Sequence, residues 1–152
     1  VAFFTADGDP LPAVNGRDYL PKASADALNF LSRRARKGFF LMIEGSQIDW
    51  GGHANDAGYV ISEMIDFDRA VRAVLDFAER DGNTLVVITG DHDAGGLTIN
   101  GGKQGDLVCQ FSTVKHTGGC IPVYAYGPGA ETFSGIYDNT QIYHKLKKLL
   151  LN

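Results

Sequence analysis

The sequence predicts an α/β fold arranged in three layers, with helices on both faces of a partial sheet. Two short apolar runs, residues 39–43 and residues 85–89, have the length and composition of buried strands. A long helical pattern over residues 55–80 separates them. Strand, helix and strand in this order predict a βαβ unit, whose strands are parallel and whose crossover is right-handed.

Three stretches repeat apolar residues at the spacing of a helical face. The first spans residues 21–37, and the last begins at residues 138–140. The middle stretch, residues 55–80, can be capped by Asn55 or Asp56. Its apolar stripe consists of Val60, Met64, Phe67, Val71, Val74, Leu75 and Ala78.

Strand signals are weaker after residue 92. Residues 97–99 and 106–111 are possible strands between glycine-containing turns. Residues 121–126 are a better candidate, although Pro122 favours an edge or first-residue position. A chain of 152 residues that is 44% hydrophobic can bury the core of one domain. We therefore expect residues 1–152 to form a single domain.

Composition argues against several kinds of partner. The net charge is -4 and the 14 Lys and Arg residues are scattered, which is untypical of a nucleic-acid-binding protein. No apolar run approaches the ~20 residues of a membrane span. No signal peptide is visible, although the chain opens on Val1 and not on Met. Cys109 and Cys120 match no disulfide framework or zinc-ligand spacing, and a bridge between them stays open.

Side chains that bind metals follow both apolar runs. Glu44 comes directly after the first run, and Asp91 and His92 follow the second. The carboxyl ends of strands in open α/β sheets are where sites are built. Asp49 and His53 lie four residues apart, so a helical stretch would aim both at one point. These positions predict a metal site at this edge of the sheet.

A third imidazole completes a ligand set. His116, together with Asp49 and His53, provides three protein ligands, and four-coordinate zinc would keep one open position, as in catalytic sites. Glu44 suits a hard cation such as magnesium. An isolated Asp-x-x-x-His pair is more often a surface pair than a ligand pair. The prediction therefore depends on the combination of separate segments.

Three segments resemble those of alkaline phosphatases. The segment Glu44-Gly-Ser-Gln-Ile-Asp-Trp-Gly-Gly-His53 resembles the family's Glu-Gly-x-x-Ile-Asp-x-x-x-His segment. Residues 82–92 are similar to its Gly-Asn-Thr-Leu strand that leads to Asp-His. His116-Thr-Gly-Gly, followed by residues 123–130, resembles its third metal segment. The matches occur in the family's order and span from about residue 39 to the C-terminus.

The resemblance implies a zinc- and magnesium-dependent phosphomonoesterase with two zinc ions. The implied ligands are Asp49, His53 and His116 for the first zinc, Asp91 and His92 for the second, and Glu44 for magnesium. Trp50 occupies a position that in the family tends to lie near the phosphate, and a hydrophobic anchor is an equally good interpretation. The resemblance also implies phosphate monoester substrates, a homodimer and a periplasmic or secreted location.

One departure limits the resemblance to the C-terminal part of the family's catalytic domain. No serine of this chain has the Asp-Ser-Ala context of the family's nucleophile. We therefore expect the isolated chain to be inactive and to cover its open sheet edge by self-association.

Two alternative functions remain. A nucleotide pyrophosphatase or phosphodiesterase-like relative would lack the magnesium ligand that Glu44 supplies, and a zinc-binding module would have no catalysis.

Overall fold

The computed structural model describes residues 4–151, so residues 1–3 of the apolar N-terminal segment lie outside it. Its helices come first, the strands follow one another, and two helical segments end the chain, so the predicted alternation of strand and helix is wrong. The elements are η1 (Ala13–Asn15), α1 (Tyr19–Arg34), α2 (Gln47–His53), α3 (Ala57–Asp81), β1 (Val86–Ile88), β2 (Asp93–Ala94), β3 (Thr98–Lys103), β4 (Asp106–Gln110), β5 (His116–Thr117), β6 (Tyr124–Tyr126), η2 (Ala130–Phe133) and α4 (Thr140–Leu151).

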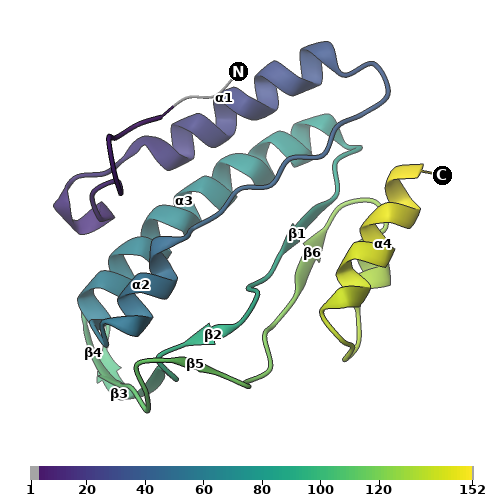
Figure 1. Ribbon diagram of the computed structural model, residues 1–152. Helices are drawn as coiled ribbons and strands as arrows, with labels where there is room; N and C mark the ends of the chain where they lie inside the picture. Colours follow the sequence, from purple (N-terminus) through teal and green to yellow (C-terminus); the bar gives the residue numbers. More distant parts are fainter. Residues whose placement is uncertain (1–3, 152) are drawn as a thin grey trace.

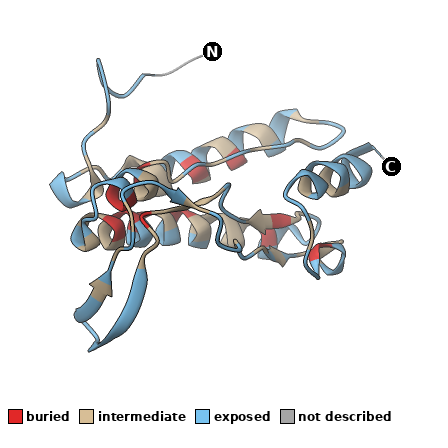
Figure 2. Ribbon diagram, turned by 60° about the horizontal axis from the view of Figure 1, so that its bottom comes forward, coloured by how far each residue is buried: buried red, intermediate tan, exposed pale blue. Residues whose placement is uncertain are grey.

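The long helix α3 is the centre of the packing. Asp56 caps it, because its carboxylate accepts a hydrogen bond of 3.0 Å from the Tyr59 N–H. Gly82, at a φ of 68°, ends it in the left-handed conformation. Helices α1 and α3 lie along each other (Figure 1), and Leu28 and Ala70 are almost fully buried. The buried residues gather mainly along these helices (Figure 2).

The strands form three small antiparallel pairs. β1 pairs with β6, β2 with β5, and β3 with β4. β1 and β6 lie between α3 and α4, which is the predicted arrangement of helices on both faces (Figure 1). The α/β fold class is therefore confirmed. The hairpin β3–β4 extends from the body with nearly all its residues exposed.

The predicted parallel βαβ unit is wrong, both in its first strand and in the direction of its pairing. Residues 39–43 form no strand, and β1 has an antiparallel partner instead of a parallel one. The reason is that a strand needs a neighbour to accept and donate its backbone hydrogen bonds. No other segment within residues 4–151 lies beside residues 39–43 as such a neighbour. The apolar run therefore passes along α3 without pairing.

A buried ionic cluster binds the N-terminal segment, residues 13–17, to α3. Arg17 donates to Glu63 at 2.5 Å and to Asp66 at 2.8 Å, and all three side chains are at most 7% exposed. The Ala13 N–H donates to Glu63 at 2.7 Å. Burial alone would lower the pKa of Arg17, but the hydrogen bonds and charges of the two carboxylates raise it above its usual value. Arg17 thus stays positively charged at neutral pH.

Three further predictions concern the cysteines, a membrane span and the C-terminal helix. Cys109 and Cys120 are both free thiols. No helix within residues 4–151 is both long and apolar enough to cross a membrane. The C-terminal helix begins after Asp138, whose side chain accepts hydrogen bonds from the Thr140 N–H and hydroxyl. These bonds lower the pKa of Asp138.

Candidate metal centre

The short helix α2 carries two of the predicted ligands, Asp49 and His53, on one face. Glycines let this helix approach its neighbours closely. A Cβ on Gly51 would lie 2.9 Å from the Val60 nitrogen of α3, and one on Gly52 would lie 2.7 Å from the Ala94 carbonyl oxygen of β2. Both distances are too short for real contacts, so α2 packs directly against both elements.

Strand β5 brings the third ligand to the same place. β5 pairs with β2 so that His116 lies opposite Ala94. The hydroxyl of Thr117 donates to Asp93 at 2.7 Å, and the Gly96 N–H donates to the same carboxylate oxygen at 3.1 Å. Asp93 therefore holds β5 against β2. No sequence pattern distinguished Asp93 from the acidic and histidine residues beside it, so we did not predict this role.

The ligand atoms of Asp49, His53 and His116 converge on one point. The Nε2 atoms of the two histidines are 3.0 Å apart, and Asp49 Oδ1 lies 3.4 Å from each of them. Zinc bonded to nitrogen and oxygen at about 2.0–2.1 Å in a tetrahedron spaces its ligand atoms by about 3.3 Å. The donor set thus fits zinc in both chemistry and spacing.

Two buried polar atoms, one in this cluster and one beside it, fit a bound cation. Asp49 Oδ1 and His92 Nδ1 are buried and have no hydrogen-bond partner within residues 4–151. An unpaired buried carboxylate oxygen is costly, whereas a bound cation would compensate its charge. The atoms lie 4.0 Å apart, and the His92 ring stacks on the His116 ring at 3.5 Å.

The orientation of His53 suits a metal ligand. Its Nδ1 lies 2.7 Å from the Val114 carbonyl oxygen. A carbonyl can only accept, so Nδ1 must carry the hydrogen, and the neutral ring leaves the lone pair on Nε2. Nε2 is the nitrogen that faces His116 and Asp49. No local pattern indicated this part for Val114, because the two residues are 61 positions apart.

Asp91 and His92 form a second pair beside the first cluster. They follow β1 in a bend, as expected, and His92 Nε2 lies 3.1 Å from Asp91 Oδ2. The Asp91 side chain is 85% exposed, whereas His92 is mostly covered. Two such atoms at this separation could share a second cation.

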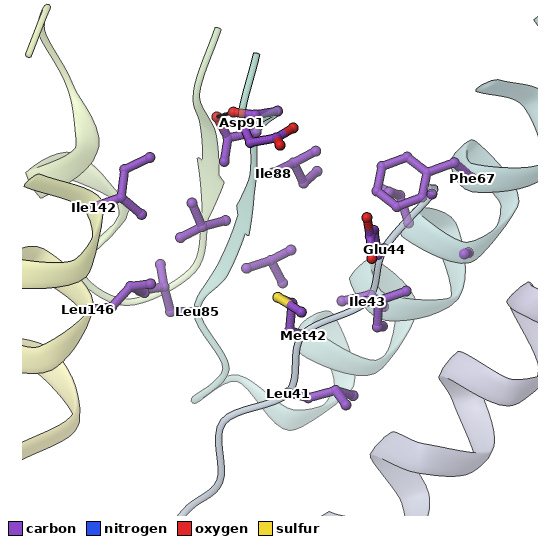
Figure 3. Close-up of a pocket in the computed structure, with 18 of the residues that line it drawn as sticks. Leu41, Met42, Ile43, Glu44, Phe67, Leu85, Ile88, Asp91, Ile142 and Leu146 are labelled. Atoms are coloured by element: carbon purple, nitrogen blue, oxygen red, sulfur yellow. Dashed lines mark hydrogen bonds between the residues drawn. The ribbon is translucent and has the colours of Figure 1, made fainter. Parts of the chain in front are cut away.

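Glu44 and Trp50 are not among the residues whose ligand atoms converge. Glu44 ends the unpaired apolar run and lines a cavity that Asp91 also lines, on another wall (Figure 3). Trp50 of α2 lines the same cavity and is 37% exposed. The structure therefore gathers Asp49, His53 and His116 into one cluster, with His92 and Asp91 beside it, and leaves Glu44 as a separate carboxylate.

A buried amide holds the first turn of α2. Gln47 is fully buried, and its Nε2 donates to the Pro10 carbonyl oxygen at 2.8 Å. The Tyr59 hydroxyl donates to Gln47 Oε1 at 2.7 Å. Burial, followed by the charge of Glu63, raises the pKa of Tyr59, so the phenol stays protonated as a donor. This network fixes the helix two residues before Asp49.

Comparison with known proteins agrees with the fold. The alkaline phosphatase family model matches residues 18–110 and 103–151. Alkaline phosphatase 4 of Bacillus subtilis is 30% identical, over 95% of this chain and 47% of the relative. Streptomycin-6-phosphate phosphatase of Streptomyces griseus is 36% identical, over 84% of this chain and 34% of the relative.

A solved structure supports the same family. A variant of the TAB5 alkaline phosphatase with magnesium bound is 46% identical and superposes with a TM-score of 0.89, over 97% of this chain and 46% of that one. The likeness defines an α/β protein with the fold of an alkaline phosphatase. The chain belongs to the alkaline phosphatase family. It spans less than half the length of these relatives.

The close packing of α2 predicts a selective effect of one methyl group. Gly52→Ala should weaken zinc binding at least tenfold, because α2 must move away from β2 and carry His53 away from His116. Overpacking of this kind costs about 1–3 kcal/mol. Calorimetric zinc titration checks the result. Gly58→Ala is the matched control, since its Cβ would meet only Asp56 Oδ1 at 3.4 Å. Equal zinc affinities of both variants would contradict the packing argument.

Proposed function

We propose that this chain supplies metal ligands to an enzyme that hydrolyses phosphate monoesters with zinc and magnesium. The observation that carries the proposal is the convergence of Asp49, His53 and His116, with ligand atoms 3.0–3.4 Å apart. This spacing supports zinc with one open coordination position, which is typical of catalytic sites. Metal-bound relatives support a metal cofactor in the family.

Each ligand has a proposed place. Asp49, His53 and His116 would hold the first zinc, Asp91 and His92 the second, and Glu44 the magnesium. When bound, these ions would stabilise the charge of the transferring phosphoryl group and of the attacking and leaving oxygens. The chain's own contribution is to orient the ligands: Val114 fixes the tautomer of His53, and Asp93 keeps β5 in place.

Phosphate monoesters are the proposed substrates. The names of the relatives, alkaline phosphatases and a streptomycin-6-phosphate phosphatase, support this class. Glu44 favours it over a nucleotide pyrophosphatase or phosphodiesterase, which by resemblance would lack the magnesium carboxylate. Trp50, which lines the same cavity, would lie near the phosphate. For the complete enzyme the resemblance supports a homodimer and a periplasmic or secreted location.

The chain alone should hydrolyse an aryl phosphate no faster than its metal-free control. Phosphate monoester hydrolysis has so high a barrier that positioning and charge stabilisation by a whole site are required. The sequence has no serine in the family's Asp-Ser-Ala context. Turnover measured on purified, zinc-loaded chain checks this. Activity that disappears in Asp91→Ala would contradict the prediction, because it would come from this chain.

A further inference from the structure

Asn55 has a backbone conformation that residues other than glycine rarely adopt. Its φ is 53°, and no other non-glycine residue between positions 4 and 151 has a positive φ. Asparagine enters this left-handed region more readily than most residues, because its short polar side chain can hydrogen-bond locally. The Asn55 N–H donates to the Gly52 carbonyl oxygen at 3.0 Å. Asn55 therefore closes the chain just after His53, the last residue of α2.

The side-chain amide of Asn55 connects α2 to a distant loop, residues 112–115. It lies 2.9 Å from the Gly52 carbonyl oxygen and 2.7 Å from the Thr113 carbonyl oxygen. Carbonyl oxygens only accept, whereas the amide nitrogen of asparagine carries two hydrogens. The amide nitrogen is therefore the atom that faces both carbonyls, and it donates to each of them. One side chain thus holds the end of α2 and the 112–115 loop together.

The next carbonyl of the same loop contacts a predicted zinc ligand. Val114 follows Thr113, and its carbonyl oxygen accepts from His53 Nδ1 at 2.7 Å. Gly95 also holds this loop, because its carbonyl oxygen accepts from the Thr113 N–H at 3.2 Å. Asn55 fixes the peptide group that directly precedes Val114, and this group limits the direction of the Val114 carbonyl.

An ordinary helix-ending residue is the alternative interpretation of Asn55. Left-handed residues commonly end helices, and glycine serves that purpose at least as well as asparagine. Asn55 is exposed, so water can replace its hydrogen bonds at little cost to overall stability. Neither the end of a helix nor an exposed position requires an amide that reaches a second segment. The contact with Thr113 is therefore the feature that calls for a further role.

We propose that Asn55 is a positioning residue for His53. Its amide holds the Thr113 carbonyl, so the Val114 carbonyl stays in place to accept from His53 Nδ1. The hydrogen then stays on Nδ1, and the lone pair of Nε2 is free for a metal. The consequence for zinc binding rests on the proposed function, whereas the state of the His53 ring can be measured without zinc.

Asn55→Gly tests this proposal, because glycine accepts a φ of 53° but has no amide to donate. Long-range hydrogen–nitrogen NMR spectra of the zinc-free chain report which ring nitrogen of His53 carries the hydrogen. At a pH where the ring is neutral, we expect mainly the Nδ1–H form in the original chain and a mixture of both forms in Asn55→Gly. Zinc affinity, measured by chelator competition, should fall about tenfold, the lower limit for residues that orient a metal ligand.

Asn100→Gly is the matched control. Asn100 Nδ2 donates to Gln110 Oε1 at 2.7 Å in the exposed β3–β4 hairpin, so this variant also loses an amide hydrogen bond. It should change neither the state of the His53 ring nor the zinc affinity. An unchanged His53 tautomer in Asn55→Gly would overturn the proposal, and so would an equal loss of zinc affinity in the two variants.

Urea denaturation separates positioning from stability. The midpoint of Asn55→Gly should lie close to that of Asn100→Gly, because both side chains are exposed. A much lower midpoint in Asn55→Gly would assign Asn55 to the stability of the fold and overturn the positioning role. If the original chain bound no zinc, the proposed function would fail, and the His53 tautomer would still decide the role of Asn55.

Discussion

Replacing Arg17 by methionine should lower the free energy of unfolding by about 3–5 kcal/mol. Arg17 is the cation between Glu63 and Asp66, whose side chains are 1% and 4% exposed. Removing one member of a buried ionic cluster leaves the remaining charges without compensation, and that costs more than the cluster contributes. Methionine keeps most of the volume, so the loss would be electrostatic.

Urea denaturation of the zinc-free chain measures this effect. Arg72→Met is the matched control, because Arg72 pairs with Asp76 four residues along the exposed face of α3, at 2.9 Å. Exposed pairs of this kind contribute about 0–1 kcal/mol. Two results would contradict the claim that the ionic cluster holds the N-terminal segment on α3. One is a loss of unfolding free energy below 1 kcal/mol in Arg17→Met, and the other is an equal loss in both variants.

His53→Ala should weaken zinc binding by at least about 100-fold. Loss of a residue that only orients a ligand costs 10–100-fold in affinity, and loss of the ligand itself should exceed that. His53 Nε2 lies 3.0 Å from His116 Nε2 and 3.4 Å from Asp49 Oδ1, so its removal leaves two ligands of the cluster. Two protein ligands rarely hold zinc against a buffer.

Competition titration with a zinc chelator measures the change. His144→Ala is the control, because His144 lies on the exposed face of α4 and should not affect zinc. Urea denaturation of the metal-free variants separates ligand loss from unfolding, since His53→Ala should retain most of the stability. Equal zinc affinity of His53→Ala and the original chain would show that the cluster is not a zinc site.

Local sequence patterns predicted the helices well. The three-and-four spacing of apolar residues predicted α1, α3 and α4, because the backbone hydrogen bonds and the apolar face of a helix repeat within a few residues. The sequence also grouped Asp49, His53 and His116, and the structure brings their side chains together. Their role as metal ligands stays a prediction. The β3–β4 hairpin was predicted as two short strands between glycine-containing turns.

Contacts between distant segments could not be predicted. The antiparallel pairing of β1 with β6 joins residues about 40 positions apart, and an apolar run alone does not specify its partner. Residues 39–43 have the composition of a strand, but no described segment pairs with them. The roles of Arg17 and Val114 depend on the same kind of long-range contact, which leaves no local pattern.

X-ray absorption at the zinc edge tests the central claim most directly. The claim is that Asp49, His53 and His116 form one zinc site in this chain. The zinc-loaded chain should hold about one tightly bound ion, with two imidazoles and a carboxylate oxygen at about 2.0–2.1 Å. The His53→Ala spectrum should lose an imidazole contribution. A six-coordinate shell of oxygens without imidazole, in a chain that remains folded, would contradict the claim.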